Sequence, residues 1–367
     1  MPRNLVVCCD GTANEFARHH TNVLKLFATL VQDPARQLAY YHPGVGTMEA
    51  VGAVTSVARS VTKLLGKAIG YGLETDIRDA YAFIMKFHEE GDRLFLFGFS
   101  RGAYTVRAVA SLLHMYGLIR HGQEPLIRYA IRMMSALNRQ SGAANSSTFT
   151  EARRFKGVFG GASCKPYFVG VWDTVSSVGW IENPLRLPYT ADNPSISIGR
   201  HAVSIDERRA FFRTNLWRPS DRSAKSGPVD LMQVWFPGAH SDVGGGYPEA
   251  ESGLSKYALE WMASEAQKAG LLIDRRKLDL VMGREGGEYA PAAPSAPMHE
   301  SLKGWWRLAE FVPKKRYNLA LRRTERRMNL FRRRTPPENP LVHDVAFLRD
   351  GYKLPPGAVR VRTDPIP

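Results

Sequence analysis

The sequence has few cysteines and no long apolar run. Its 367 residues include three cysteines, Cys8, Cys9 and Cys164, too few for a disulfide framework, and we interpret the adjacent pair as small buried apolar residues. No stretch approaches the roughly 18 apolar residues of a transmembrane helix, and the apolar run before Asp10 is too short for a signal peptide. We therefore expect synthesis in the cytoplasm, with export open only to a secretion system that reads no cleavable signal.

Acidic residues are scarce where basic residues gather. The net charge is +15, and the segment Lys314–Arg334 holds ten basic residues against one acidic residue, Glu325. The rest of the chain has only a small positive excess, so the charge is a local feature and not a property of the whole surface. The hydrophobic fraction of 44% is ordinary for a globular protein and allows a sizeable core.

Short segments rich in β-branched and aromatic residues alternate with helical patterns. The predicted buried strands are Asn4–Cys9, Leu38–His42, Arg93–Phe97, Pro166–Trp172 and Asp230–Phe236. Helical patterns between them include Thr21–Leu30, Leu73–His88 and Ala103–His114. Strands that are apolar on both faces and alternate with helices predict an α/β fold of the α/β-hydrolase type, with a mostly parallel central sheet flanked by helices. Ligand sites in such folds lie at the carboxyl ends of the strands.

The sequence pattern predicts three parts of the chain. Residues 1–282 are expected to form the catalytic domain, with cap insertions at about 119–161 and 176–228. A Pro/Ala/Gly-rich linker at 283–297 then leads to a basic, helical C-terminal region, 298–367, that packs on the core.

The sequence GFSRG follows the third predicted strand and precedes a helix, which is typical of a nucleophile elbow. Ser100 would sit on a sharp strand-to-helix turn, and only small residues such as Gly98 and Gly102 fit two positions to either side. The helix N-terminus and the amide of Arg101 would then stabilise an oxyanion beside the serine. We therefore predict that Ser100 is a nucleophile.

A serine needs a base, and the base needs an acid that orients it. His240 lies after a strong apolar strand and before a glycine-rich turn, whereas its rival His42 precedes the serine, against the usual Ser, acid, His order of this fold. Asp173, at the end of the fourth predicted strand, is the favoured acid. Asp242 is the competitor, but at two residues from His240 it is better suited to bracing the turn or the site entrance.

The CCDGT segment after the first strand offers further groups. The amides of Gly11 and Thr12 are candidates for a second oxyanion donor. Asp10 could order this loop or bind a polar substrate group. DGT after a strand also occurs in haloacid-dehalogenase-like enzymes. Their motif requires a second carboxylate two positions after the first, where this sequence has Thr12, so that interpretation is disfavoured.

Five motifs together resemble a known family. CCDGTANE, GFSRGAYTVR, GVWDTVSSVG, HAVSIDERRAFF and WFPGAHSDVGGGY follow one another over residues 4–247, with weaker similarity around MHESLKGWW. In this order they are similar to the type VI secretion lipase effectors, whose catalytic domain is an α/β hydrolase also found in fungi and many bacteria. The resemblance implies a triad of Ser100, Asp173 and His240, and a phospholipase activity. A smaller ester or thioester remains an alternative substrate.

The basic segment Lys314–Arg334 intersperses apolar residues among its charges, which favours an amphipathic helix. Such a helix could lie on an anionic membrane, with Trp305 and Trp306 as interfacial anchors. The alternatives are a solvated or structural face and, less favoured, nucleic acid.

Ester hydrolysis through an acyl-enzyme, without metal or cofactor, is thus the predicted chemistry, acting on an ester or phospholipid substrate. The competing hypothesis is an inactive hydrolase-like scaffold that binds an anionic surface or a partner. The sequence does not fix the oligomeric state.

Overall fold

The centre of the computed structural model is an eight-stranded sheet in which every neighbouring pair of strands is parallel. Its order is β12-β11-β8-β7-β4-β3-β1-β2. The strands are β1 (Asn4–Cys9), β2 (Gln37–His42), β3 (Arg93–Phe99), β4 (Pro166–Trp172), β7 (Ile198–Ser204), β8 (Asp230–Phe236), β11 (Leu341–His343) and β12 (Val359–Val361). This confirms the predicted α/β class and the parallel sheet.

The structure describes most of the chain. The described residues are 2–11, 20–44, 57–139, 146–175, 179–180, 183–184, 187–210, 212–218, 230–304, 307, 310–311, 314–318 and 323–364.

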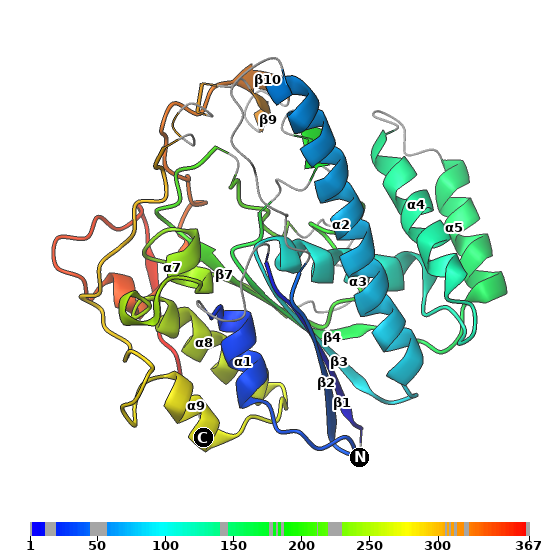
Figure 1. Ribbon diagram of the computed structural model, residues 1–367, viewed down its shortest axis with the longest axis horizontal. Coiled ribbons are helices and arrows are strands. Elements are labelled where there is room, and N and C mark those ends of the chain that lie inside the picture. The colour runs from blue at the N-terminus through cyan, green and yellow to red at the C-terminus, as the bar shows by residue number, and fades with distance from the viewer. Residues whose placement is uncertain are drawn as a thin grey trace.

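Helices cover both faces of the sheet (Figure 1). On one face lie α1 (Asn22–Thr29), α8 (Ser255–Lys268) and α9 (Arg275–Val281), and on the other lie α2 (Val57–Phe87), α3 (Arg101–Tyr116), α4 (Pro125–Arg139) and α5 (Ser146–Phe159). Short helical turns α7 (His240–Gly244), η1 (Glu249–Glu251) and η2 (Asp344–Ala346) complete the described helices. None of the helices in the described part of the chain is both long and apolar enough to cross a bilayer.

The first strand shows how the sequence divides the core. Leu5, Val7 and Cys9 belong to the apolar cluster that includes α2 and α3, whereas Val6 and Cys8 belong to the cluster that includes α1 and α8. Successive side chains of a strand point to opposite faces, so an apolar run without alternation requires two covered faces. The buried, unpaired thiols of Cys8 and Cys9 are part of this packing.

Several predicted strands and helices agree with the structure. The bounds of β1, β4 and β8 are those expected, and α2 is longer than its pattern indicated because it begins at Val57. The expected insertion at 119–161 contains the pair α4 and α5. The segment 283–297 has no helix or strand, and it packs on the core, where the Ala290 amide donates to Glu249 Oε1 at 3.2 Å.

Two expectations need correction. The segment 176–228, expected to be an insertion, contains β7, which pairs with both β4 and β8 in the middle of the sheet. The described residues of the basic segment 314–334 do not form a helix: β9 (Lys314–Asn318) and β10 (Arg323–Arg327) form an antiparallel two-stranded ribbon. The helical interpretation failed because apolar residues spaced among charges also suit paired strands. Trp305 and Trp306, the expected membrane anchors, lie outside the described residues.

Candidate active site

Ser100 occupies a strained turn between β3 and α3. Its backbone has φ 56° and ψ −117°, a region that residues with a side chain rarely adopt. A Cβ atom added to Gly98 would lie 2.5 Å from the Gly102 carbonyl oxygen, and one added to Gly102 would lie 2.1 Å from the Cys9 carbonyl oxygen. The turn therefore leaves no room for a side chain at either glycine.

Helix α3 begins directly after the serine. The helix begins at Arg101, and within the described chain the Ser100 side chain makes no capping hydrogen bond to it. The Ser100 amide donates to the Trp172 carbonyl at 3.1 Å, which ties the turn to the end of β4. The Arg101 guanidinium faces Asp76 of α2, with Nε 3.7 Å from Oδ2. The positive end of a helix thus lies at the residue after the serine.

Asp173 and His240 meet at the ends of β4 and β8. His240 Nδ1 lies 2.5 Å from Asp173 Oδ2, and both side chains are almost completely buried. The Phe99 and Phe212 rings pack on the imidazole, with centroids 4.6 and 4.8 Å away. Because Phe99 precedes Ser100, the serine segment lies next to the imidazole. The His240 Nε2 atom is buried and has no hydrogen-bond partner among the described residues.

The electrostatics of this pair suit a neutral base beside an ionised acid. Burial alone would raise the pKa of the Asp173 carboxyl, but the Arg334 guanidinium and the His240 ring outweigh it and hold that pKa well below its usual range. Burial lowers the pKa of His240 below its ordinary value, against the hydrogen bond to Asp173, which raises it. The lowered pKa favours the neutral imidazole, the form that can accept a proton.

Glu207, which the sequence argument did not single out, holds the backbone of the histidine. Its Oε2 accepts the His240 amide at 3.2 Å, while Oε1 accepts from the Arg209 amide at 2.8 Å and the Ser301 hydroxyl at 3.0 Å. Burial would raise the pKa of Glu207, yet the Arg209 guanidinium lowers it to about 2. Only its place in the HAVSIDERRAFF motif marked this residue, since its contact with His240 spans 33 positions.

Asp10 anchors the loop after β1. Its Oδ2 accepts the hydroxyls of Thr21 at 2.6 Å and Tyr41 at 2.7 Å, and its Oδ1 accepts the Gly11 amide at 2.7 Å. These contacts correspond to the expected loop-ordering role. The Gly11 amide is engaged by Asp10 in this structure, so its oxyanion role stays a prediction, and Thr12 lies outside the described residues.

The rival residues lie elsewhere. His42, at the end of β2, faces Asp76 and Asp79 of α2, with Nε2 3.9 and 3.8 Å from their nearest oxygens. Asp242 Oδ1 lies 2.6 Å from His299 Nδ1, and its Oδ2 accepts the His299 amide at 3.0 Å. Asp242 therefore braces the segment around His299, a contact that the sequence did not indicate.

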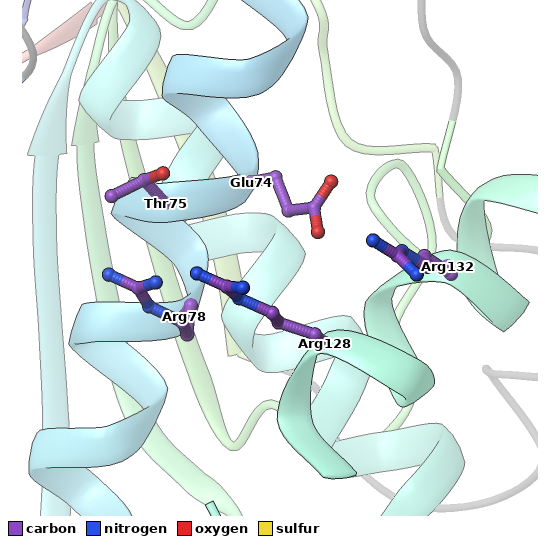
Figure 2. A pocket seen from close by; sticks show the side chains of 5 residues that line it. All are labelled: Glu74, Thr75, Arg78, Arg128 and Arg132. Atoms are coloured by element: carbon purple, nitrogen blue, oxygen red, sulfur yellow. The ribbon is translucent and has the colours of Figure 1, made fainter. Parts of the chain in front are cut away.

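Two hollows of the described surface lie apart from the serine and histidine. A cavity of about 50 Å³ between α2 and α4 is lined by Glu74, Thr75, Arg78, Arg128 and Arg132; Figure 2 shows Arg128 reaching from α4 toward α2. A larger hollow of about 560 Å³ is lined by His114, Met115, Phe149, Thr150, Ala152, Arg153 and Tyr189. Among the described residues, no group of three His, Cys, Asp or Glu side chains could hold a metal ion.

A parallel sheet flanked by helices, a strained serine after β3 and an Asp–His pair at strand ends define a domain of the α/β-hydrolase class. Residues 3–265 match the family model described as the T6SS phospholipase effector Tle1-like catalytic domain. This match covers well over half of the chain, which therefore belongs to that family.

Individual relatives match parts of the chain. The uncharacterized protein YEL023C of Saccharomyces cerevisiae is 35% identical over 226 residues, 59% of this chain and 33% of the yeast protein. A crystal structure of an uncharacterized protein from Pseudomonas aeruginosa has 22% identity and a TM-score of 0.41, covering 74% of this chain and 46% of that one. The structure of the Tle1 effector bound to the VgrG spike has 18% identity and a TM-score of 0.36, covering 69% of this chain and 52% of that one. The chain thus spans between a third and about half of the length of these relatives.

Proposed function

We propose that this chain is a serine hydrolase that cleaves the acyl esters of phospholipids or related lipids, with Ser100 as nucleophile, His240 as base and Asp173 as the acid that orients the base. The observation that carries the proposal is the buried contact between His240 Nδ1 and Asp173 Oδ2 at 2.5 Å, beside the strained turn of Ser100. The His240 Nε2 atom, without a partner among the described residues, is the atom that would accept the serine proton.

The reaction follows from these roles. The Ser100 oxygen attacks the ester carbonyl while its proton moves to His240 Nε2, and the amide of Arg101 stabilises the oxyanion. The tetrahedral intermediate then collapses, the alcohol leaves with the proton from His240, and an acyl-enzyme remains. Water, deprotonated by His240, attacks this ester and releases the fatty acid and the serine. Asp173 stays ionised throughout and stabilises the imidazolium.

The phospholipid substrate is supported by membership in a phospholipase effector family. A soluble short-chain ester or a thioester is the competing substrate.

The test compares wild type with Ser100→Ala on p-nitrophenyl esters of increasing chain length and on vesicles of anionic phospholipid. Matched vesicles of zwitterionic phospholipid and two salt concentrations separate surface binding from turnover. Fatty acid release from vesicles that drops at least about 10⁴-fold in Ser100→Ala supports the proposal. Hydrolysis of short soluble esters without release of fatty acid from vesicles would show that the substrate is a soluble ester and not a lipid. Release of a phosphorylated headgroup, or activity unchanged in Ser100→Ala, would overturn the serine mechanism.

A further inference from the structure

Asp173 is bound by a cation, Arg334, as well as by the histidine. Arg334 Nη2 donates to Asp173 Oδ2 at 3.0 Å, and Arg334 Nη1 donates to Asp173 Oδ1. The same guanidinium donates to the carbonyls of Ser204 at 3.1 Å and Phe212 at 2.5 Å. The side chains of Arg334 and Asp173 are 9% and 0% exposed. The contact is therefore a bidentate ion pair between buried groups and not a surface salt bridge.

The segment that carries Arg334 is itself fixed in place. Glu310, which is fully buried, accepts the Ala210 amide at 2.6 Å through Oε1 and the Asn329 side chain at 2.6 Å through Oε2. Asn329 also donates to the Arg208 carbonyl at 2.9 Å. These contacts attach residues 310 and 329–334 to the chain just after β7, where the loop beside His240 begins.

The backbone before Arg334 turns sharply to reach the site. Leu330 and Phe331 both have positive φ, 48° and 62°, which side-chain-bearing residues adopt only when their surroundings enforce it. Arg208 supplies part of that enforcement, because its Nε and Nη2 donate to the Phe331 carbonyl at 3.3 and 3.2 Å.

A buried carboxylate with only one partner would be costly and free to rotate. Asp173 also has a positive φ of 38°, and the Ser204 amide donates to its Oδ1 at 3.0 Å. With Arg334 bound to both carboxylate oxygens and the Ser204 amide bound to Oδ1, the carboxylate presents Oδ2 to His240 Nδ1 in a single orientation.

We propose that Arg334 is a positioning residue for the catalytic acid, so that the basic C-terminal segment completes the active site from outside the family-matched residues 3–265. This inference rests on the proposed function and adds to it a part of the site that the matched segment does not contain. The charged groups around His240 are Asp173, Glu207 and Arg209, and Arg334 acts on the histidine through Asp173.

The test uses the full chain with Arg334→Met, Arg334→Lys and the control Arg333→Met, assayed on the best soluble ester at a series of pH values. Arg333 is 59% exposed and lies 3.4 Å from Asp206, so its replacement removes an equal charge without touching Asp173. Arg334→Met should lower kcat by roughly 10²-fold with little change in KM, because Asp173 loses its orientation. It should also move the acidic limb of kcat/KM to higher pH, because the uncompensated carboxylate stabilises the protonated imidazole.

Arg334→Lys keeps the positive charge but cannot make the bidentate contact of a guanidinium. It should recover part of kcat, and the acidic limb of its kcat/KM profile should lie near the wild-type position. If circular dichroism shows that Arg334→Met does not fold, the test rests on Arg334→Lys. A wild-type kcat in the lysine variant would then overturn the proposal. So would a folded Arg334→Met that matches Arg333→Met in kcat and pH profile. If instead wild type and Ser100→Ala are equally active, the proposed function itself has failed.

Discussion

Two regions build this site, and they reach it in different ways. The elbow around Ser100 is encoded within about ten residues, by a strand, two glycines and a helix start. The C-terminal segment contributes Arg334 through a contact that spans 161 positions. A local pattern can be recognised because its parts are adjacent in sequence, whereas an ion pair of this kind exists only once the sheet has formed. In the proposed mechanism all three reacting groups lie in the family-matched part, and Arg334 adds a contact to the acid from outside it.

The largest effect is expected from the acid itself. Asp173→Asn should lower kcat/KM about 10⁴-fold, since an amide cannot stabilise the imidazolium and favours the wrong tautomer. Steady-state hydrolysis of a soluble ester measures this. The matched control is Asp242→Asn, whose side chain contacts His299 and the Ala239 amide but not the His240 ring, and it should retain nearly wild-type activity. Equal losses in the two variants would contradict the assignment of the acid.

The elbow can be broken sterically without changing any reacting group. In Gly102→Ala the new Cβ would lie 2.1 Å from the Cys9 carbonyl oxygen, so the free energy of unfolding should fall by about 1–3 kcal/mol or more. Gly157→Ala in α5 is the control, because its Cβ would meet nothing within 4 Å, and it should be stabilised by about 0.5–1 kcal/mol. Urea denaturation measures both. A Gly102→Ala protein as stable as wild type would show that the turn is not constrained as described.

The C-terminal attachment can be loosened at Glu310. Glu310→Gln replaces one acceptor oxygen with a donor facing the Ala210 amide or the Asn329 side chain, which should cost about 1–3 kcal/mol of stability. The kcat of Glu310→Gln should also fall, but by a smaller factor than the kcat of Arg334→Met. Glu300→Gln, at a 48% exposed carboxylate paired with Arg208, should change stability by no more than about 0.5 kcal/mol. Unchanged kcat in a destabilised Glu310→Gln would separate the attachment from the active site.

The smallest expected effect is on the pH profile of the wild type. Burial lowers the pKa of His240 from 6.5, and the base acts in its neutral form. Activity should therefore be lost as the pH falls, with the acidic limb of kcat/KM centred below 6.5. Asp173 adds no limb in this range, because its pKa lies far lower. A limb centred above 6.5 would contradict the burial of the imidazole.

Much of the sheet could be predicted from sequence, and so could the position of the proposed reacting residues after strands. β1, β4 and β8 are apolar runs between polar borders, and Ser100, Asp173 and His240 each follow such a run. β7 was missed because Arg200 and His201 interrupt it; in the structure Arg200 pairs with Asp230 and Glu265, and burial lowers the pKa of His201 to about 3. β11 and β12, with three residues each, are too short for any periodicity.

The residues that support the site could not be found in this way. Glu207, Glu310 and Arg334 are charged side chains that a sequence argument assigns to solvent. Each is buried against partners from distant parts of the chain. The prediction of a helix in the basic segment was wrong because charge and spacing do not distinguish a helix from paired strands. The last arginine of this segment, Arg334, points into the protein.

The central claim, that Ser100 is an activated nucleophile, is tested most directly by reaction of the folded wild-type protein with a fluorophosphonate, followed by mass spectrometric mapping of the adduct. The serine oxygen displaces fluoride from phosphorus only when a base takes its proton. We expect one adduct per chain, on Ser100, none in Ser100→Ala and much slower labelling in Asp173→Asn. A folded wild-type protein that stays unlabelled, or that is labelled at another residue, would contradict the account.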